Sequence, residues 1–294
     1  MIRLRDGSLW VVKGCHHPLD GVVAVIRVFE GRRVKRLGEA YEIMGRYYRH
    51  YMRFLSEFGK VVPVVPREEV SEYVRGAESR EVLREGLSRL HAATLEFIDL
   101  LSGYGLKCGL SGSLLGGYYT AGSDIDLVCA EGRVSSYEVL KALRKEGVTE
   151  SLSPTEALEE VLVVGELIPS EPHARILTRK LTQGKFKGIK YTLRILDCGE
   201  ERGLLGPYDV NREEHVLIKL TNTTHKTPAV YEVSVLRPRI PYEKAYLISY
   251  RARLTELPQE TLIAGKGLTH SRLDEGLLII DFDAPNTTIE FMSY

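Results

Sequence analysis

Two aspartates separated by one residue, Asp124 and Asp126, have the spacing in this chain that most directly indicates chemistry. They open an apolar run over residues 125–130, which predicts a β-strand. Side chains alternate between the faces of a strand, so both carboxylates point to one side, about 7 Å apart, while Ile125 and Leu127 face the core. Paired carboxylates need a cation, and Mg²⁺ prefers oxygen ligands and keeps coordination positions for phosphates. The spacing therefore predicts a magnesium site.

A Gly-Ser step, Gly112-Ser113, precedes this strand by ten residues. It follows a short apolar run over residues 106–110 and lies where a helical turn can begin. Exposed backbone N–H groups at such a turn can hold a phosphate, because glycine allows close approach and the Ser113 hydroxyl adds a hydrogen bond. This step and the aspartate pair together predict a site for a phosphate ligand with Mg²⁺.

Basic residues are concentrated between residues 172 and 196, a stretch that contains no acid. If residues 171–182 form a helix, Arg175 and Arg179 share one of its faces and can reach a triphosphate or a polyanionic acceptor. The positions from Lys187 onward also fit the solvated face of a strand. The basic residues of the stretch are Arg175, Arg179, Lys180, Lys185, Lys187, Lys190 and Arg194.

The segment SGSLLGGYYTAGSDIDL, residues 111–127, resembles the signature of the nucleotidyltransferase superfamily of the DNA polymerase beta type. That signature is a Gly-Ser step, an excursion of about ten residues and an Asp-x-Asp strand. The whole chain also looks like archaeal proteins that combine this catalytic domain with an N-terminal hairpin and a β-rich C-terminal extension. In those proteins the hairpin carries a turn similar to residues 14–18, Gly-Cys-His-His-Pro.

The resemblance implies transfer of a nucleoside monophosphate from an NTP to an acceptor, with release of pyrophosphate. It implies two Mg²⁺ ions, for which Mn²⁺ can substitute, held by Asp124, Asp126 and a third carboxylate on a later strand, for which Asp197 is the candidate. It places Gly112, Ser113 and Ser123 among the nucleotide-binding residues. The acceptor is left open between RNA, protein and a small molecule.

A second function class remains open beside this one, namely a non-catalytic module that binds nucleotide or RNA with the same fold. Retention of three carboxylates favours the enzyme, because a sensor needs fewer of them. Another Asp-x-Asp, Asp281 and Asp283, has no Gly-Ser step before it, and we interpret it as the end of a strand.

The remaining pattern predicts an α+β protein in three parts. Residues 1–66 read as a hairpin (8–13 and 22–29), an amphipathic helix (39–58) and an extended segment with two prolines (61–66). Residues 67–200 read as the catalytic domain, a mixed sheet with packed helices like that of polymerase beta. Its helices are expected at 67–103, 135–146, 154–164 and 171–182, and a strand at 187–196. Residues 201–294 contain short strands without a convincing helix, which indicates a small barrel or sandwich.

The amino-acid composition limits the function classes and the cellular location that we expect for the protein. The chain has 294 residues with 40 basic and 40 acidic side chains, so zero net charge excludes a bulk coat on nucleic acid. No apolar stretch is long enough for a membrane span, and four cysteines without a CxxC pair suggest reduced thiols. We therefore expect a cytoplasmic protein that does not bind membranes. Only two Gln and three Asn occur, which points to a thermophile.

Overall fold

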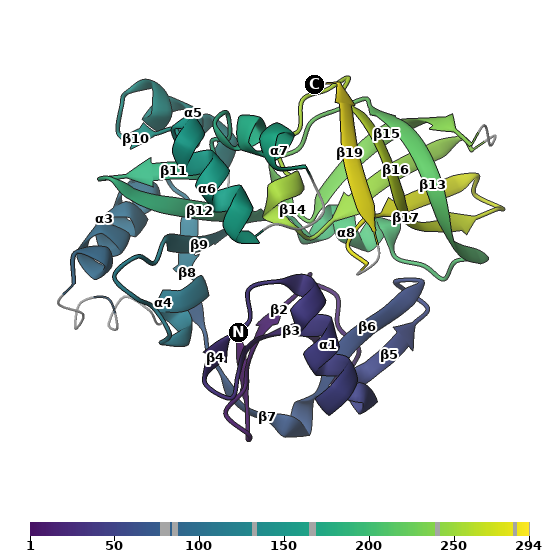
Figure 1. Ribbon diagram of the computed structural model, residues 1–294, viewed down its shortest axis with the longest axis horizontal. Coiled ribbons are helices and arrows are strands. Elements are labelled where there is room, and N and C mark those ends of the chain that lie inside the picture. Colours follow the sequence, from purple (N-terminus) through teal and green to yellow (C-terminus); the bar gives the residue numbers. More distant parts are fainter. Residues whose placement is uncertain are drawn as a thin grey trace.

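The structure is a computed structural model that describes residues 1–76, 83, 88–130, 134–164, 169–238, 242–284 and 287–293. It is an α+β protein with three β-sheets, one of which closes into a barrel (Figure 1). The sheets follow one another along the chain, and each has its own buried apolar core. The expected α+β class and C-terminal barrel are confirmed.

The N-terminal sheet has the strand order β5-β6-β3-β2-β1-β7, with β4 beside β3. One face of this sheet packs against helix α1 around Trp10 and Met44, which are both fully buried. The expected hairpin of β2 and β3 is confirmed by antiparallel pairing. The elements are β1 (Ile2–Leu4), β2 (Leu9–Val12), β3 (Gly21–Phe29), β4 (Arg32–Arg33), α1 (Leu37–Tyr47), β5 (Met52–Leu55), β6 (Lys60–Pro66) and β7 (Val70–Tyr73).

Of three further expectations for this region, the two helices were wrong. The helix expected over 39–58 ends at Tyr47, and β5 follows it. The proline-containing segment is extended as expected, because it forms strand β6. This strand lies between β5 and β3, and Pro63 and Pro66 are accommodated within its pairing. The segment expected to be helical from residue 67 begins with a single 3-10 turn, Arg67–Glu69, and continues as β7, which pairs with β1, so the N-terminal sheet continues past Pro66.

The central sheet has the order β10-β11-β12-β9-β8. Strands β9 and β12 are parallel, and helices α3 and α5 cover one face through a core that includes Phe97, Leu127, Leu140 and Leu193. The elements are α3 (Arg89–Gly103), β8 (Lys107–Leu110), α4 (Gly112–Gly116), β9 (Ile125–Ala130), α5 (Ser136–Lys145), β10 (Thr149–Glu150), α6 (Pro154–Val164), α7 (Ser170–Leu177), β11 (Gln183–Phe186), β12 (Ile189–Leu196) and α8 (Cys198–Leu204).

The C-terminal barrel closes where β13 pairs with β17 along ten residues. Strand β19 adds to β17, and the short strand β14 leaves the barrel to pair with the end of β12 in the central sheet. Buried Tyr231, Ile263 and Phe282 belong to its core. The strands are β13 (Val210–Leu220), β14 (Lys226–Thr227), β15 (Ala229–Arg237), β16 (Lys244–Ser249), β17 (Leu262–Arg272), β18 (Leu277–Asp281) and β19 (Thr288–Ser293).

The cysteines are paired, contrary to the expectation of reduced thiols. Cys108 and Cys129 lie opposite each other on β8 and β9, with 4.0 Å between their Cα atoms. Cys15 in the hairpin turn is bonded to Cys198 at the start of α8, 183 residues away. Neither pair could be inferred from spacing, because each depends on strand register or on how separate sheets pack. Within the described ranges, no helix combines the length and apolar character needed to cross a bilayer.

Candidate active site

The paired carboxylates lie at the start of β9, on the face of the central sheet opposite α3 and α5. Ile125 and Leu127 point into the core, whereas Asp126 points to the other face, as the alternation predicts. Ser123 closes a turn before the strand: its hydroxyl accepts the N–H of Thr120 at 2.8 Å, and its own N–H donates to the Thr120 carbonyl. The turn fixes the point at which Asp124 enters β9.

The Gly-Ser step lies directly against this carboxylate pair. Gly112 has φ of +61°, and a Cβ atom on it would be 1.9 Å from Oδ2 of Asp126. The N–H of Ser111 donates to the Asp126 carbonyl at 2.9 Å, and Ser113 is buried in the first turn of α4. Only glycine leaves the space that the carboxylate occupies, so the structure brings the Gly-Ser step and the Asp-x-Asp strand together.

The surroundings of Asp124 and Asp126 raise the pKa values of both carboxyl groups and so disfavour their ionisation. Burial, together with the charges of Glu160 and Asp126, raises the pKa of Asp124 to about 7. Burial also raises the pKa of Asp126, although Arg194, Arg27 and Arg33 act in the opposite direction. Desolvated carboxylates close to one another are costly when ionised, and a bound cation would relieve that cost.

Cations from the N-terminal sheet face the pair. Arg27 lies on β3 and donates to the carbonyls of Val34 and Lys35 at 2.9 and 3.0 Å. Arg33 on β4 lies 5.6 Å from the ring centre of Tyr118, whose hydroxyl is hydrogen-bonded to Arg27. Two guanidinium groups are thereby positioned beside Asp126 by contacts to backbone carbonyls and an aromatic ring.

Strand β12 supplies two further cations on the same face as Asp126. In the parallel register Asp126 is opposite Thr192, so Lys190 and Arg194 are its diagonal neighbours. Lys190 forms an ion pair with Glu160 of α6 at 3.5 Å. Arg194 makes no hydrogen bond or ion pair within the described residues, and neither do the carboxylates of Asp124 and Asp126. Unpaired charges of both signs therefore face one another across the sheet surface.

The structure does not bring Asp197 to this site. It follows Leu196, which pairs with Ala130, and so lies five residues beyond the position opposite Asp126, about 16 Å along the strand. Its Oδ1 caps α8 by accepting the N–H of Gly199 at 2.9 Å, and its Oδ2 pairs with Lys226 of β14 at 2.6 Å. Asp197 ties the barrel to the central sheet, and the acid close to the pair is Glu160.

Most basic residues of the stretch between residues 172 and 196 have partners within the protein. Arg175 is exposed on α7, and Arg179 follows the end of that helix, so the two do not share a helical face. Neither is among the charges that shift the pKa of Asp124 or Asp126. The partners are Glu171 for Arg175, Glu156 for Lys185, Glu96 for Lys187, Glu160 for Lys190, and Ala252 and Thr255 for the buried Lys180.

Sequence reasoning missed the N-terminal cations and Glu160. A signal for one of these cations exists, because Arg27 interrupts an otherwise apolar strand, GVVAVIRVF. A charge inside a half-buried strand is costly unless something compensates it. Glu160 carries no such signal, because one acid in a helix with several is unremarkable.

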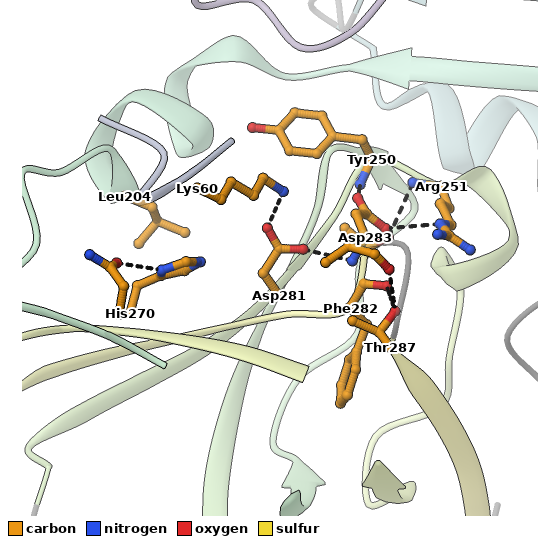
Figure 2. Close-up of polar contacts among 12 residues, drawn as sticks. Lys60, Leu204, Tyr250, Arg251, His270, Asp281, Phe282, Asp283 and Thr287 are labelled. Carbon is orange, nitrogen blue, oxygen red and sulfur yellow. Dashed lines mark hydrogen bonds and ion pairs between the residues drawn. The ribbon is translucent and has the colours of Figure 1, made fainter. Parts of the chain in front are cut away.

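A second group of buried charges joins the N-terminal sheet to the barrel, and it contains the Asp-x-Asp that we interpreted as a strand end (Figure 2). Asp281 at the end of β18 pairs with Lys60 of β6, with side chains only 4% and 12% exposed. Asp283 pairs with Arg251 at 3.2 Å and accepts the N–H of Tyr250. All these charges have partners in the protein, which indicates an interface.

The donor set of the first site fits a hard divalent ion. Its ligands would be carboxylate oxygens, and the described residues contain no group of three or more His, Cys, Asp or Glu side chains arranged to hold a metal. An ion bound at Asp124 and Asp126 would therefore need further oxygens from water or substrate, as Mg²⁺ commonly has.

Comparisons with protein-family models, curated proteins and solved structures found no match for this chain.

Proposed function

We propose that the chain is a Mg²⁺-dependent nucleotidyltransferase with a core of the DNA polymerase beta type. The observation that carries the proposal is the contact between Gly112 and Asp126, because it joins the two halves of the Gly-Ser and Asp-x-Asp signature in one site. The unpaired carboxylates and the surrounding arginines give that site the charges that a metal-bound triphosphate requires.

In this proposal Asp124 and Asp126 hold Mg²⁺, which when bound neutralises phosphate charge and activates the attacking oxygen. Arg27, Arg33 and Arg194 bind non-bridging phosphate oxygens. The acceptor oxygen forms a bond to the α-phosphorus, the bond from that phosphorus to the bridging oxygen breaks, pyrophosphate leaves with the bonding electrons, and the acceptor proton passes to water. The residues contribute mainly by positioning and by electrostatic stabilisation of charge on the transferred group.

The position of Asp197 favours a second candidate, a module that binds NTP without transferring it. A third carboxylate at the expected place is missing from the described site, and Glu160 is engaged with Lys190. In the enzyme, Glu160 would leave Lys190 when metal binds. In the binding module, nucleotide would bind in a saturable manner without pyrophosphate release.

The test has two readouts, Mg²⁺-dependent NTP binding and pyrophosphate release with each NTP in the presence of RNA, protein and small-molecule acceptors. We expect both for the unaltered chain, and loss of both in Asp124→Asn and Asp126→Asn. Asp197→Asn is the matched control, because asparagine also caps a helix and this position lies away from the pair. Pyrophosphate release that persists in both pair variants would refute the proposal, and binding without release would select the module.

A further inference from the structure

We propose that a basic and aromatic surface on the N-terminal sheet binds a single-stranded nucleic acid and leads its end, as the acceptor, to the carboxylate pair. This surface, which we name the β4 surface, consists of Phe29, Arg32, Arg46 and Tyr47, from β3, β4 and α1. The inference rests on the proposed function, since it names the acceptor class of the same site.

Positive charge is concentrated in the segment that carries the β4 surface. Residues 27–53 contain eight basic and three acidic side chains, although the chain as a whole is neutral. Arg32 and Arg46 are exposed, and neither forms an ion pair within the described part of the chain. A polyanion can therefore bind both guanidinium groups without displacing an acidic partner from them.

Aromatic rings lie among these cations. In the antiparallel register Phe29 is opposite Arg32, so the two side chains lie on the same face of the β3–β4 hairpin. The centre of the Phe29 ring is 4.9 Å from that of Tyr47, and the guanidinium group of Arg46 is 5.2 Å from the centre of the Tyr47 ring. Tyr47 is 49% exposed, which leaves ring surface on which a base can stack.

The β4 surface ends beside the candidate active site, because the next residue on β4 is Arg33. The guanidinium group of Arg33 lies 5.6 Å from the centre of the Tyr118 ring, and Tyr118 lies just after α4, the helix that begins at the Gly-Ser step. A Cβ atom on Gly116 of α4 would be 2.7 Å from Cδ2 of Leu9 on β2. The N-terminal sheet thus contacts α4 directly, and a strand that leaves the β4 surface at Arg33 arrives at the Gly-Ser step.

These properties fit a single-stranded nucleic acid better than other polyanions. Guanidinium groups bind successive phosphates, and an exposed ring stacks on an unpaired base, which a duplex keeps inside. An acidic peptide offers charge without flat bases, and an anionic membrane offers no strand end. The 3′ hydroxyl of a strand supplies the acceptor oxygen that the proposed transfer requires.

The experiment measures binding of a short, fluorescein-labelled single-stranded RNA to the full chain by fluorescence anisotropy, without nucleotide and over a range of salt concentrations. We expect Arg32→Gln with Arg46→Gln to weaken binding about tenfold and to make the slope of log affinity against log salt shallower by about 1.4, because each lost phosphate contact removes about 0.7. Tyr47→Leu should weaken binding about fivefold, and Tyr47→Phe should retain it, because stacking needs only the ring.

The matched control is Lys141→Gln with Lys145→Gln, which also removes two exposed positive charges but from α5, on the other side of the central sheet. This control should leave RNA binding unchanged. A second assay follows addition of a labelled nucleotide to the 3′ end of the RNA. The Arg32 and Arg46 double variant should raise the KM for RNA about tenfold and leave the KM for NTP unchanged, since neither residue belongs to the proposed triphosphate site.

Three results would overturn the inference. The first is equal RNA affinity in the double variant and the control, and the second is equal competition by polyglutamate of the same charge, which would make the surface a general anion site. The third is RNA binding without nucleotide addition in a chain that releases pyrophosphate with another acceptor. Absence of Mg²⁺-dependent NTP binding would instead count against the proposed function, because RNA binding is measured without nucleotide. DNA of the same sequence, used as competitor, distinguishes RNA from DNA as the bound strand.

Discussion

Gly112 and Asp126 are so close that a methyl group on the glycine would overlap the carboxylate, with Cβ 1.9 Å from Oδ2. The contact joins α4 to β9 at the point where phosphate and metal chemistry would meet. It also makes a glycine obligatory for two separate reasons, the space that Asp126 takes and the positive φ of +61°.

Gly112→Ala should therefore lower the free energy of unfolding by about 2–4 kcal/mol and abolish Mg²⁺-dependent NTP binding. Gly117→Ala is the matched control: Gly117 has φ of +73°, but a methyl group on it would meet no atom within 4 Å, so only the backbone cost of about 1 kcal/mol applies. Urea denaturation and nucleotide titration measure the two effects. Equal losses in both variants would show that the contact with Asp126 is unimportant.

Asp124→Asn should stabilise the metal-free protein. The pKa of this carboxyl is about 7 in the folded chain against an ordinary value of 3.8, so the folded state retains a proton that the unfolded state releases between those values. Stability therefore falls as pH rises from about 4 to 7, by up to about 4 kcal/mol from this group. Denaturation in EDTA should show a smaller fall for Asp124→Asn. Parallel pH profiles for the two proteins would contradict the argument.

Binding of Mg²⁺ and NTP should release a proton from Asp124 below pH 7. The metal requires the carboxylate form, so affinity should drop about tenfold for each pH unit below the pKa of this group and level off above it. Calorimetry in buffers of different ionisation enthalpy, at pH 6 and pH 8.5, measures the proton count. Asp197→Asn should show the same pH dependence, and a pH-independent affinity in the unaltered chain would rule the linkage out.

The ion pair between Lys60 and Asp281 should cost more to break than to replace. Its side chains are 12% and 4% exposed, and removal of one partner leaves a buried charge alone, at a cost of about 3–5 kcal/mol. Lys60→Met with Asp281→Leu should cost much less than the sum of the single variants. A double-mutant cycle in urea measures the coupling between the N-terminal sheet and the barrel. Additive losses would show that the pair is not coupled.

The two disulfides should differ in their contribution to stability. In the chain-entropy description, a crosslink over 183 residues contributes about 5 kcal/mol and one over 21 residues about 3 kcal/mol. Cys15→Ser should therefore lower the free energy of unfolding more than Cys108→Ser. Thiol labelling of the denatured, unreduced chain checks the premise. Four reactive thiols would mean that neither crosslink forms.

The local sequence pattern was sufficient to predict the strand that carries Asp126 and the hairpin of β2 and β3. Asp126 faces away from the core because alternation along a strand is a local property, and the barrel strands carry the same signal. The helix expected over 39–58 shows the limit of such patterns. Tyr48 and Tyr51 keep helical spacing in the sequence, yet both pack edge-on against Trp10, and the chain continues as β5.

The composition of the site could not be predicted in the same way. Asp197 has the right residue type at the end of a strand, but parallel register with β9 puts it about five residues too far along. Arg27 and Arg33 lie near Asp126 only because the N-terminal sheet packs against the central one, which no spacing within a segment encodes. The positive charge of the basic stretch was overestimated for a related reason, because its acidic partners, such as Glu96 and Glu156, come from distant parts of the chain.

Strand β14 links the barrel to the central sheet, and this link affects how the protein unfolds. The chain leaves the central sheet through α8, builds β13, returns to lay Lys226 and Thr227 against the end of β12, and then completes the barrel. The central sheet and the barrel are therefore joined by backbone pairing and are not two consecutive, independent units. A fragment that stops before β13 would lose β14, one of the two parallel neighbours of β12, together with Lys226, the partner of Asp197. We therefore expect the central sheet and the barrel to unfold as one cooperative unit.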